Sequence, residues 1–404
     1  MRDRFKKLVN IFTIKGYTIN IFTNFVRNFI ENEQNIILII YFMKRNLLLL
    51  IGLIAIVFPM NLKAQEGPKI SGFVQGLWQG NLNDNGKVKS NTFQARRVRM
   101  SVEGTLVKDL TYKIQGDFIR KPMLVDFFLK YKVCDGFAIQ AGQFKTPFSM
   151  ESPINPVNLE IFDYGESVQQ LSGYNDICGV GSIGRDLGIM ASGKLFKLEG
   201  NDFALVDYSI GVFNGNGANE KDNNNRKDFV GKLEIHPMLK DLTLSGSYYY
   251  GWYDKNYDTE ETYANIHNGA RQRWSAGIQY SDGDIMVRAE YLNGITGYKN
   301  KVYDSIGYIT GATDELIWTS TGYYAVAGYN FRFGNNDSQK LMPVLRYEHF
   351  TKDAAVANGG TNYYTVGVNY WPMKSLNFKL DYSLIQPETG AKSHRVVGIL
   401  SYKF

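Results

Sequence analysis

Apolar and polar side chains alternate with a period of two along most of the sequence after residue 65, and this pattern limits the possible folds more than any other feature. Residues 376–384 (LNFKLDYSL) show it most clearly, and residues 110–118 and 274–280 repeat it. Successive side chains of a β-strand point to opposite faces, so each segment predicts a strand with one apolar and one polar face. Because no segment there keeps a helical period for long, we expect an all-β fold.

The connections between the predicted strands sort by length. In chain order the even-numbered connections are short, whereas the odd-numbered ones include all the long ones, at 146–184, 215–227, 254–270 and 296–319. Short turns at one end and long loops at the other are typical of a transmembrane antiparallel β-barrel. We expect about sixteen strands, at residues 69–82, 91–105, 110–118, 123–133, 137–145, 185–195, 203–214, 228–236, 242–253, 271–280, 284–295, 320–333, 341–350, 362–371, 376–386 and 394–404.

A soluble, secreted β-sheet protein would also alternate, because one face of its sheet meets water. Two features favour the barrel instead. Aromatic residues gather at the ends of the outward-facing sets, as at Tyr248, Tyr250 and Trp252, where a membrane interface would hold them. The sequence also ends in Tyr402-Lys403-Phe404, which resembles the terminal signal of outer-membrane barrels. A mean hydropathy of -0.26 is too polar for a bundle of membrane helices.

The first 64 residues indicate export. Met43-Lys44-Arg45 begins a positively charged segment, an apolar run follows, and Ala64 offers a cleavage point before Gln65. We therefore expect a signal peptide at 43–64, a mature barrel at 65–404, and a non-native upstream extension at 1–42.

The basic net charge of +6 belongs to this leading segment. Residues 1–64 carry nine basic and three acidic residues, so residues 65–404 hold 36 of each. The expected mature chain is neutral, and we predict no nucleic-acid partner.

Five short motifs follow one another in a recognisable order. They are FQARRVR at 93–99, GQFKTPFSME at 142–151, GRDLG at 184–188, GVFNG at 211–215 and NYWP at 369–372. Their order and spacing resemble the phosphate-selective porin O and P family over nearly all of residues 65–404. The resemblance implies an outer-membrane porin whose third loop, residues 146–184, folds inward and narrows the pore.

Strand parity assigns charges to the predicted lumen. Val98 and Met100 share the lipid-facing parity, so Arg97 and Arg99 face the lumen as a short anion-binding ladder. Arg96 has the lipid-facing parity and would meet lipopolysaccharide phosphate or extend to the interface. The predicted pore-lining, anion-binding residues are Arg97, Arg99, Lys113, Arg271, Arg273 and Arg288.

Parity gives the lumen more cations than acids, so either the bore is positive or most charges pair across strands. The further lumenal cations predicted by parity are Lys130, Lys132, Lys194, Lys232, Arg332, Arg346, Lys379, Arg395 and Lys403.

The third loop is too long for an ordinary connection. It begins after Lys145, and its apolar residues, such as Phe148, need a place to be buried. Its acids Glu151, Glu160 and Asp163 would lie opposite the arginine wall and create a transverse field at the constriction. This departs from a purely cationic filter, so we expect a weak preference for anions such as phosphate.

The expected function is passive diffusion of small solutes across the outer membrane by a homotrimer in contact with lipid and lipopolysaccharide. A structural or adhesive barrel and an outer-membrane hydrolase are the alternatives. A hydrolase would need a Ser or Asp paired with His, yet none of the four His residues lies in a nucleophile motif. We predict no enzyme activity, catalytic residue, metal or cofactor.

Overall fold

The computed structural model describes residues 67–83, 85–121, 123–181, 183–197, 203–237, 239, 241–259, 262–303 and 309–404. The predicted signal peptide and upstream extension lie outside these residues.

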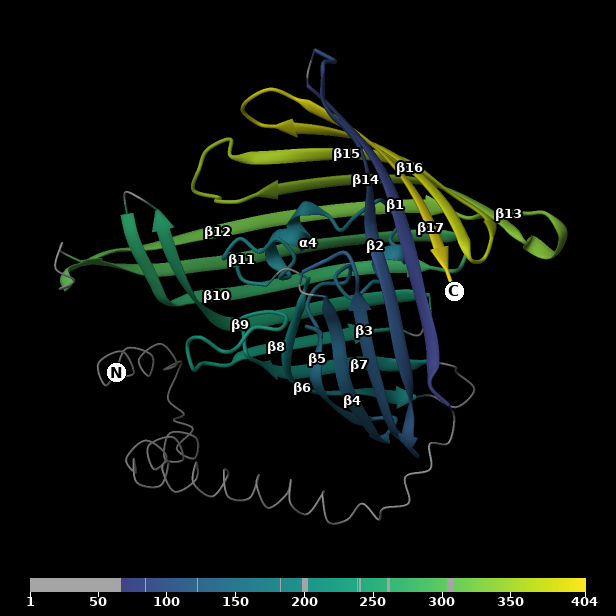
Figure 1. Cartoon of the computed structure of the whole chain (residues 1–404), viewed down its shortest axis with the longest axis horizontal. Coiled ribbons are helices and arrows are strands. Elements are labelled where there is room, and N and C mark those ends of the chain that lie inside the picture. Colours follow the sequence, from purple (N-terminus) through teal and green to yellow (C-terminus); the bar gives the residue numbers. More distant parts are fainter. Residues whose placement is uncertain are drawn as a thin grey trace, which may run out of the picture. The chain divides into compact units, whose positions relative to one another are not determined.

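One antiparallel sheet holds every strand and closes on itself, because β1 pairs with both β2 and β17 (Figure 1). β12 and β13 both pair with β14 and are interrupted only at Asn330, so they form one strand of the wall. The predicted sixteen-stranded barrel is therefore confirmed. The strands are β1 (Lys69–Asn83), β2 (Val88–Val107), β3 (Leu110–Asp117), β4 (Leu124–Cys134), β5 (Phe137–Lys145), β6 (Arg185–Lys197), β7 (Ala204–Phe213), β8 (Asp228–Ile235), β9 (Leu242–Thr259), β10 (Thr262–Ser281), β11 (Ile285–Tyr303), β12 (Ile309–Tyr329), β13 (Phe331–Phe333), β14 (Gln339–Thr351), β15 (Gly360–Met373), β16 (Leu376–Pro387) and β17 (Ser393–Lys403).

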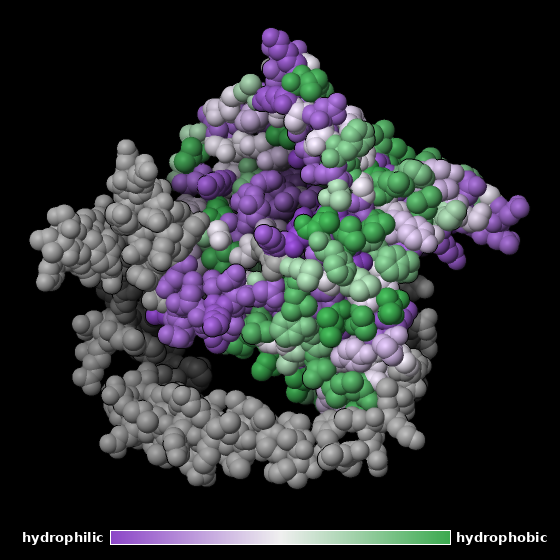
Figure 2. All heavy atoms as spheres, viewed as in Figure 1, coloured by the Kyte–Doolittle hydropathy of each residue, from purple (hydrophilic) through white to green (hydrophobic). Residues whose placement is uncertain are grey.

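Polar side chains face inward and apolar ones outward, which is the reverse of a soluble protein. In β16 the buried residues include Asn377, Lys379 and Asp381, whereas Phe378 and Leu380 between them are exposed. In Figure 2 hydrophobic residues cover the strands around β2 to β5, and hydrophilic ones gather over the middle of the view and the hairpin tips. Such an outward apolar face needs lipid as its solvent. No helix among the described residues is long and apolar enough to cross a bilayer.

Two predicted loops, 254–270 and 296–319, are wrong in part. The β9–β10 hairpin continues to Thr259 and Thr262, and the β11–β12 hairpin to Tyr303 and Ile309. Antiparallel hydrogen bonding needs only backbone groups, so these hairpins continue where the apolar alternation has stopped. The loop predicted at 215–227 lies between β7 and β8 as expected.

The third loop contains the 3-10 helix η1 (Pro156–Asn158) and the short helix α4 (Glu166–Leu171). Its apolar side chains, such as Phe148 and Leu159, form one buried cluster with inward apolar residues of the wall, such as Val326 and Val344. This cluster is the core of the molecule, and it exists because the loop lies against the inner face of the barrel.

Candidate functional site

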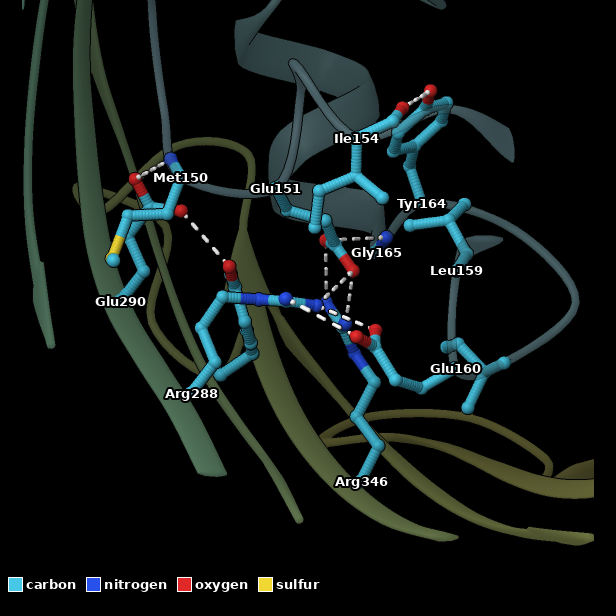
Figure 3. Close-up of polar contacts among 12 residues, drawn as sticks. Met150, Glu151, Ile154, Leu159, Glu160, Tyr164, Gly165, Arg288, Glu290 and Arg346 are labelled. Carbon is cyan, nitrogen blue, oxygen red and sulfur yellow. Dashed lines mark hydrogen bonds and ion pairs between the residues drawn. The ribbon is translucent and has the colours of Figure 1, made fainter. Parts of the chain in front are cut away.

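Two carboxylates of the third loop meet two arginines of the barrel wall (Figure 3). Glu160 lies 2.7 Å from Nη2 of Arg288 on β11, and Glu151 lies 2.6 Å from Nη1 of Arg346 on β14. Glu151 is also 3.7 Å from Arg288, so the four groups form one network. Both arginines and Glu151 are buried, and charges buried in this way must be paired to be tolerated. The network therefore holds the loop against the wall.

Asp163 forms the second junction between loop and wall. It lies 2.9 Å from Arg96 and 3.5 Å from Arg97 on β2. The prediction that Arg96 faces lipid is wrong, because Arg96 is only 8% exposed and also donates to the backbone carbonyl of Phe162. The reason is a bulge: Arg97 pairs with Gln75, but Ala95 pairs with Gly76, which leaves Arg96 without an opposite residue. A bulge of this kind redirects a side chain.

The other residues predicted to line the pore also have carboxylate partners. Arg273 binds Asp176 of the third loop, with Nη1 to Oδ2 at 2.6 Å, and donates to the carbonyl of Leu171 at 2.6 Å. The remaining pairs lie within the wall or its connections: Arg271 with Asp228 at 2.5 Å, Arg99 with Asp117 at 2.9 Å, and Lys113 with Glu103 at 3.5 Å.

Lys145 and Phe148 hold the first part of the third loop. Nζ of Lys145 donates to the carbonyls of Ser152 and Ile154 at 2.6 and 2.7 Å, and to the Tyr164 hydroxyl at 2.9 Å. Phe148 is 1% exposed and packs edge-on against Tyr249 of β9. Both residues fold the loop inward, and the ammonium of Lys145 is held by neutral oxygens and not by a carboxylate.

The pKa values of the loop acids reflect this pairing. Burial opposes ionisation of Glu160, Asp163 and Asp176, but their arginine partners outweigh it and hold each pKa below its usual value. Burial has the larger effect on Glu151, whose pKa is raised in spite of Arg346 and Arg288.

Residues 70–397 match the family described as phosphate-selective porin O and P. The chain belongs to this family. No significant match is found among curated protein sequences.

Solved porins share the fold of this porin. The anion-selective porin from Comamonas acidovorans is 11% identical, with a TM-score of 0.56 over 84% of this chain and 99% of that one. OmpT of Vibrio cholerae, in its trimer form, is 13% identical, with a TM-score of 0.54 over 84% of this chain and 100% of its own. The channel DcaP of Acinetobacter baumannii is 14% identical, with a TM-score of 0.52 over 86% and 99%. The family and fold make the porin an outer-membrane channel for small solutes and point away from an enzyme.

Most lumenal cations of the porin are neutralised. Among the described residues, every lumenal cation predicted by parity has a carboxylate within 4.0 Å except Lys130, Lys379, Arg395 and Lys403. Lys340 also lacks one, and it is absent from the predicted lumenal cations because the strand was expected to begin at residue 341. The charged residues Arg346 and Glu348 share its parity and would have placed it in the lumen.

The described residues contain no group of three or more His, Cys, Asp or Glu side chains placed to hold a metal ion. Cys134 is exposed, Cys178 is buried, and both are free.

Proposed function

We propose that the porin prefers small anions weakly, phosphate among them. The supporting observation is an imbalance in the lumen after ion pairing, counted over the described residues. Lys130, Lys145, Lys340, Lys379, Arg395 and Lys403 have no carboxylate within 4.0 Å, whereas the acids of the lumenal wall and third loop without a cation at that distance are Asp186, Glu290, Asp381 and Glu166. Glu290 instead accepts hydrogen bonds from Ser149, Met150 and Tyr324. The surplus of positive charge on the wall of a narrow water-filled bore favours anions.

The preference is weak because the arginine ladder is largely compensated. Arg97 keeps the largest number of unused hydrogen-bond donors. Its Nε and Nη1 have no hydrogen-bond partner, and only Nη2 approaches Asp163. It is 2% exposed, so it acts through its field and not by direct contact with the solute. The other predicted pore-lining residues hold the third loop in place or join neighbouring parts of the wall.

We further propose that the chain is exported and assembles as a trimer. Residues 43–64 are a signal peptide, residues 65–404 the mature barrel, and residues 1–42 an upstream extension. The mature chain forms a homotrimer, supported by the trimer form of the similar OmpT. Exposed outward aromatics such as Tyr248 and Tyr323 would contact lipid and lipopolysaccharide at the interfaces. The barrel has no enzymatic activity of its own.

Reconstitution of residues 65–404 in planar bilayers tests the channel. Conductance should appear in three equal steps per insertion, and proteoliposomes should swell in small neutral sugars. A heat-modifiable, folded barrel that never conducts would support the structural or adhesive alternative.

A further inference from the structure

A second charged feature lies in the bore, away from the arginine ladder. Lys340 is the second residue of β14, and in the strand register it lies opposite Trp371 of β15. Its Nζ lies 3.8 Å from the centroid of the indole ring. Both residues share strand parity with inward neighbours, Met342 and Asn369, which are buried in the lumen. The pair therefore faces the pore.

Lys403 lies on the same side of the bore, at the end of β17. It shares its parity with buried Ser401, and its Nζ donates to Oδ1 of Asn158 at 2.6 Å in a contact open to solvent. Asn158 ends η1, so the third loop reaches down to this level. Two residues after Asn158, the backbone carbonyl of Glu160 accepts a hydrogen bond from Asn369 of β15 at 2.7 Å, which fixes the loop along the wall.

These residues lie near the short connections of the barrel, which mark its periplasmic end. Lys340 follows the turn at η2 (Asn335–Asp337), Trp371 precedes the turn at 374–375, and Lys403 ends the last strand. A solute that has passed the third loop meets them as it leaves the narrow part of the pore.

The charges of the two lysines are uncompensated within the described part of the chain, where neither has a carboxylate within 4.0 Å. Arg332, the register partner of Lys340 on β13, is paired with Asp284. The lysines come from strands three apart, roughly 14 Å along the sheet. Each ammonium is a point charge on a flexible stem, so both can turn toward one anion between them.

The chemistry of this cluster favours a particular class of anion. Arginine forks match phosphate in a bidentate manner, but no arginine here is free to do so. Trp371 is half-buried and offers an apolar edge beside the ammonium of Lys340, which a hydrated inorganic anion cannot use. We propose that Lys340, Lys403 and Trp371 form an exit-side binding site for organic carboxylates that carry an apolar group. This proposal rests on the proposed channel function.

Reversal potentials of the trimer in planar bilayers test the site, with potassium benzoate, acetate or phosphate on the periplasmic side. Benzoate should permeate better than acetate in spite of its size. Trp371→Leu should reduce the benzoate-to-acetate permeability ratio by about two- to tenfold, the weight of one aromatic pair, whereas Trp371→Phe should preserve it. Lys340→Gln with Lys403→Gln should lower the permeability of both carboxylates. Lys130→Gln, which removes an equally unpaired lysine from β4, should leave the ratio unchanged.

The outcomes separate the two proposals. A wild-type protein that forms no channel overturns both. A conducting channel whose benzoate-to-acetate ratio is insensitive to Trp371→Leu, or equally sensitive to Lys130→Gln, overturns the exit-side site and leaves the porin function intact. Phosphate that permeates as well as benzoate would likewise show that the indole contributes nothing. Each variant is folded if its band on gels still shifts on heating as the wild-type band does. Its unitary conductance in bilayers should also equal that of the wild type.

Discussion

Nη2 of Arg96 lies 2.9 Å from Oδ2 of Asp163, although strand parity alone would place Arg96 in the lipid. The bulge in β2 therefore converts a sequence of two adjacent arginines into two cations on the inner face. Both approach a single carboxylate of the third loop. This geometry makes Asp163 an anchor of the constriction.

Asp163→Asn combined with Glu160→Gln should release the middle of the third loop. Each substitution removes a carboxylate from a buried arginine, and the freed cations add positive charge to the bore. We expect a higher single-channel conductance and a reversal potential shifted toward anions. Glu234→Gln is the matched control, because Glu234 pairs with Lys232 on the wall and does not contact the loop. Unchanged conductance in the double variant would show that other contacts suffice to hold the loop.

Arg99→Gln should destabilise the barrel more than it alters selectivity. Arg99 and Asp117 are 2% and 0% exposed and form a pair at 2.9 Å, so the substitution leaves a buried carboxylate without its partner. Breaking such a pair costs about 3–5 kcal/mol. The temperature at which the folded band disappears on gels should fall, and Asp117→Asn in the same chain should restore much of it. A large shift in reversal potential with normal stability would instead support a direct role in anion binding.

Acid should release the third loop only at low pH. The pKa values of Glu160, Asp163 and Asp176 are depressed, so their ion pairs stabilise the loop above the ordinary carboxyl pKa and fail as the pH falls through the depressed values. Glu151, whose pKa is raised, protonates earlier, but Glu160 still pairs with Arg288. Single-channel conductance should be constant from about pH 8 to about pH 4 and rise below that. A rise centred near neutral pH would contradict this assignment.

Gly165→Ala should displace the third loop from β14. A Cβ atom at this position would overlap the guanidinium of Arg346 and the carboxylate of Glu348, whereas the backbone itself is unstrained. Conductance should increase and fluctuate more. Gly76→Ala in β1 is the control, since its Cβ would meet nothing within 4 Å. Equal behaviour of the two variants would show that the loop can shift at no cost.

Sequence alone could predict the wall of this barrel because alternation is a local property. The segment at 376–384 shows it, and β16 spans Leu376–Pro387. Sequence could not predict how far the hairpins beyond 254 and 296 extend, because backbone hydrogen bonding there continues without an apolar face.

The arrangement of charges was less predictable. Parity placed Arg288 and Arg273 in the lumen, but it cannot show that Glu160 and Asp176, more than 90 residues away in sequence, fold back onto them. A single bulge reversed the prediction for Arg96, and a strand boundary placed two residues too late hid Lys340. Tertiary pairing, not residue type, decides which cations remain free to act on a solute.

We propose a conducting pore whose loop-held constriction leaves a small surplus of positive charge. The reversal potential of the purified mature trimer under a potassium chloride gradient tests it most directly. We predict a potential with the sign of anion preference and a magnitude well below that of an ideally anion-selective membrane. A potential with the sign of cation preference, or one close to the ideal anion value, would contradict the account.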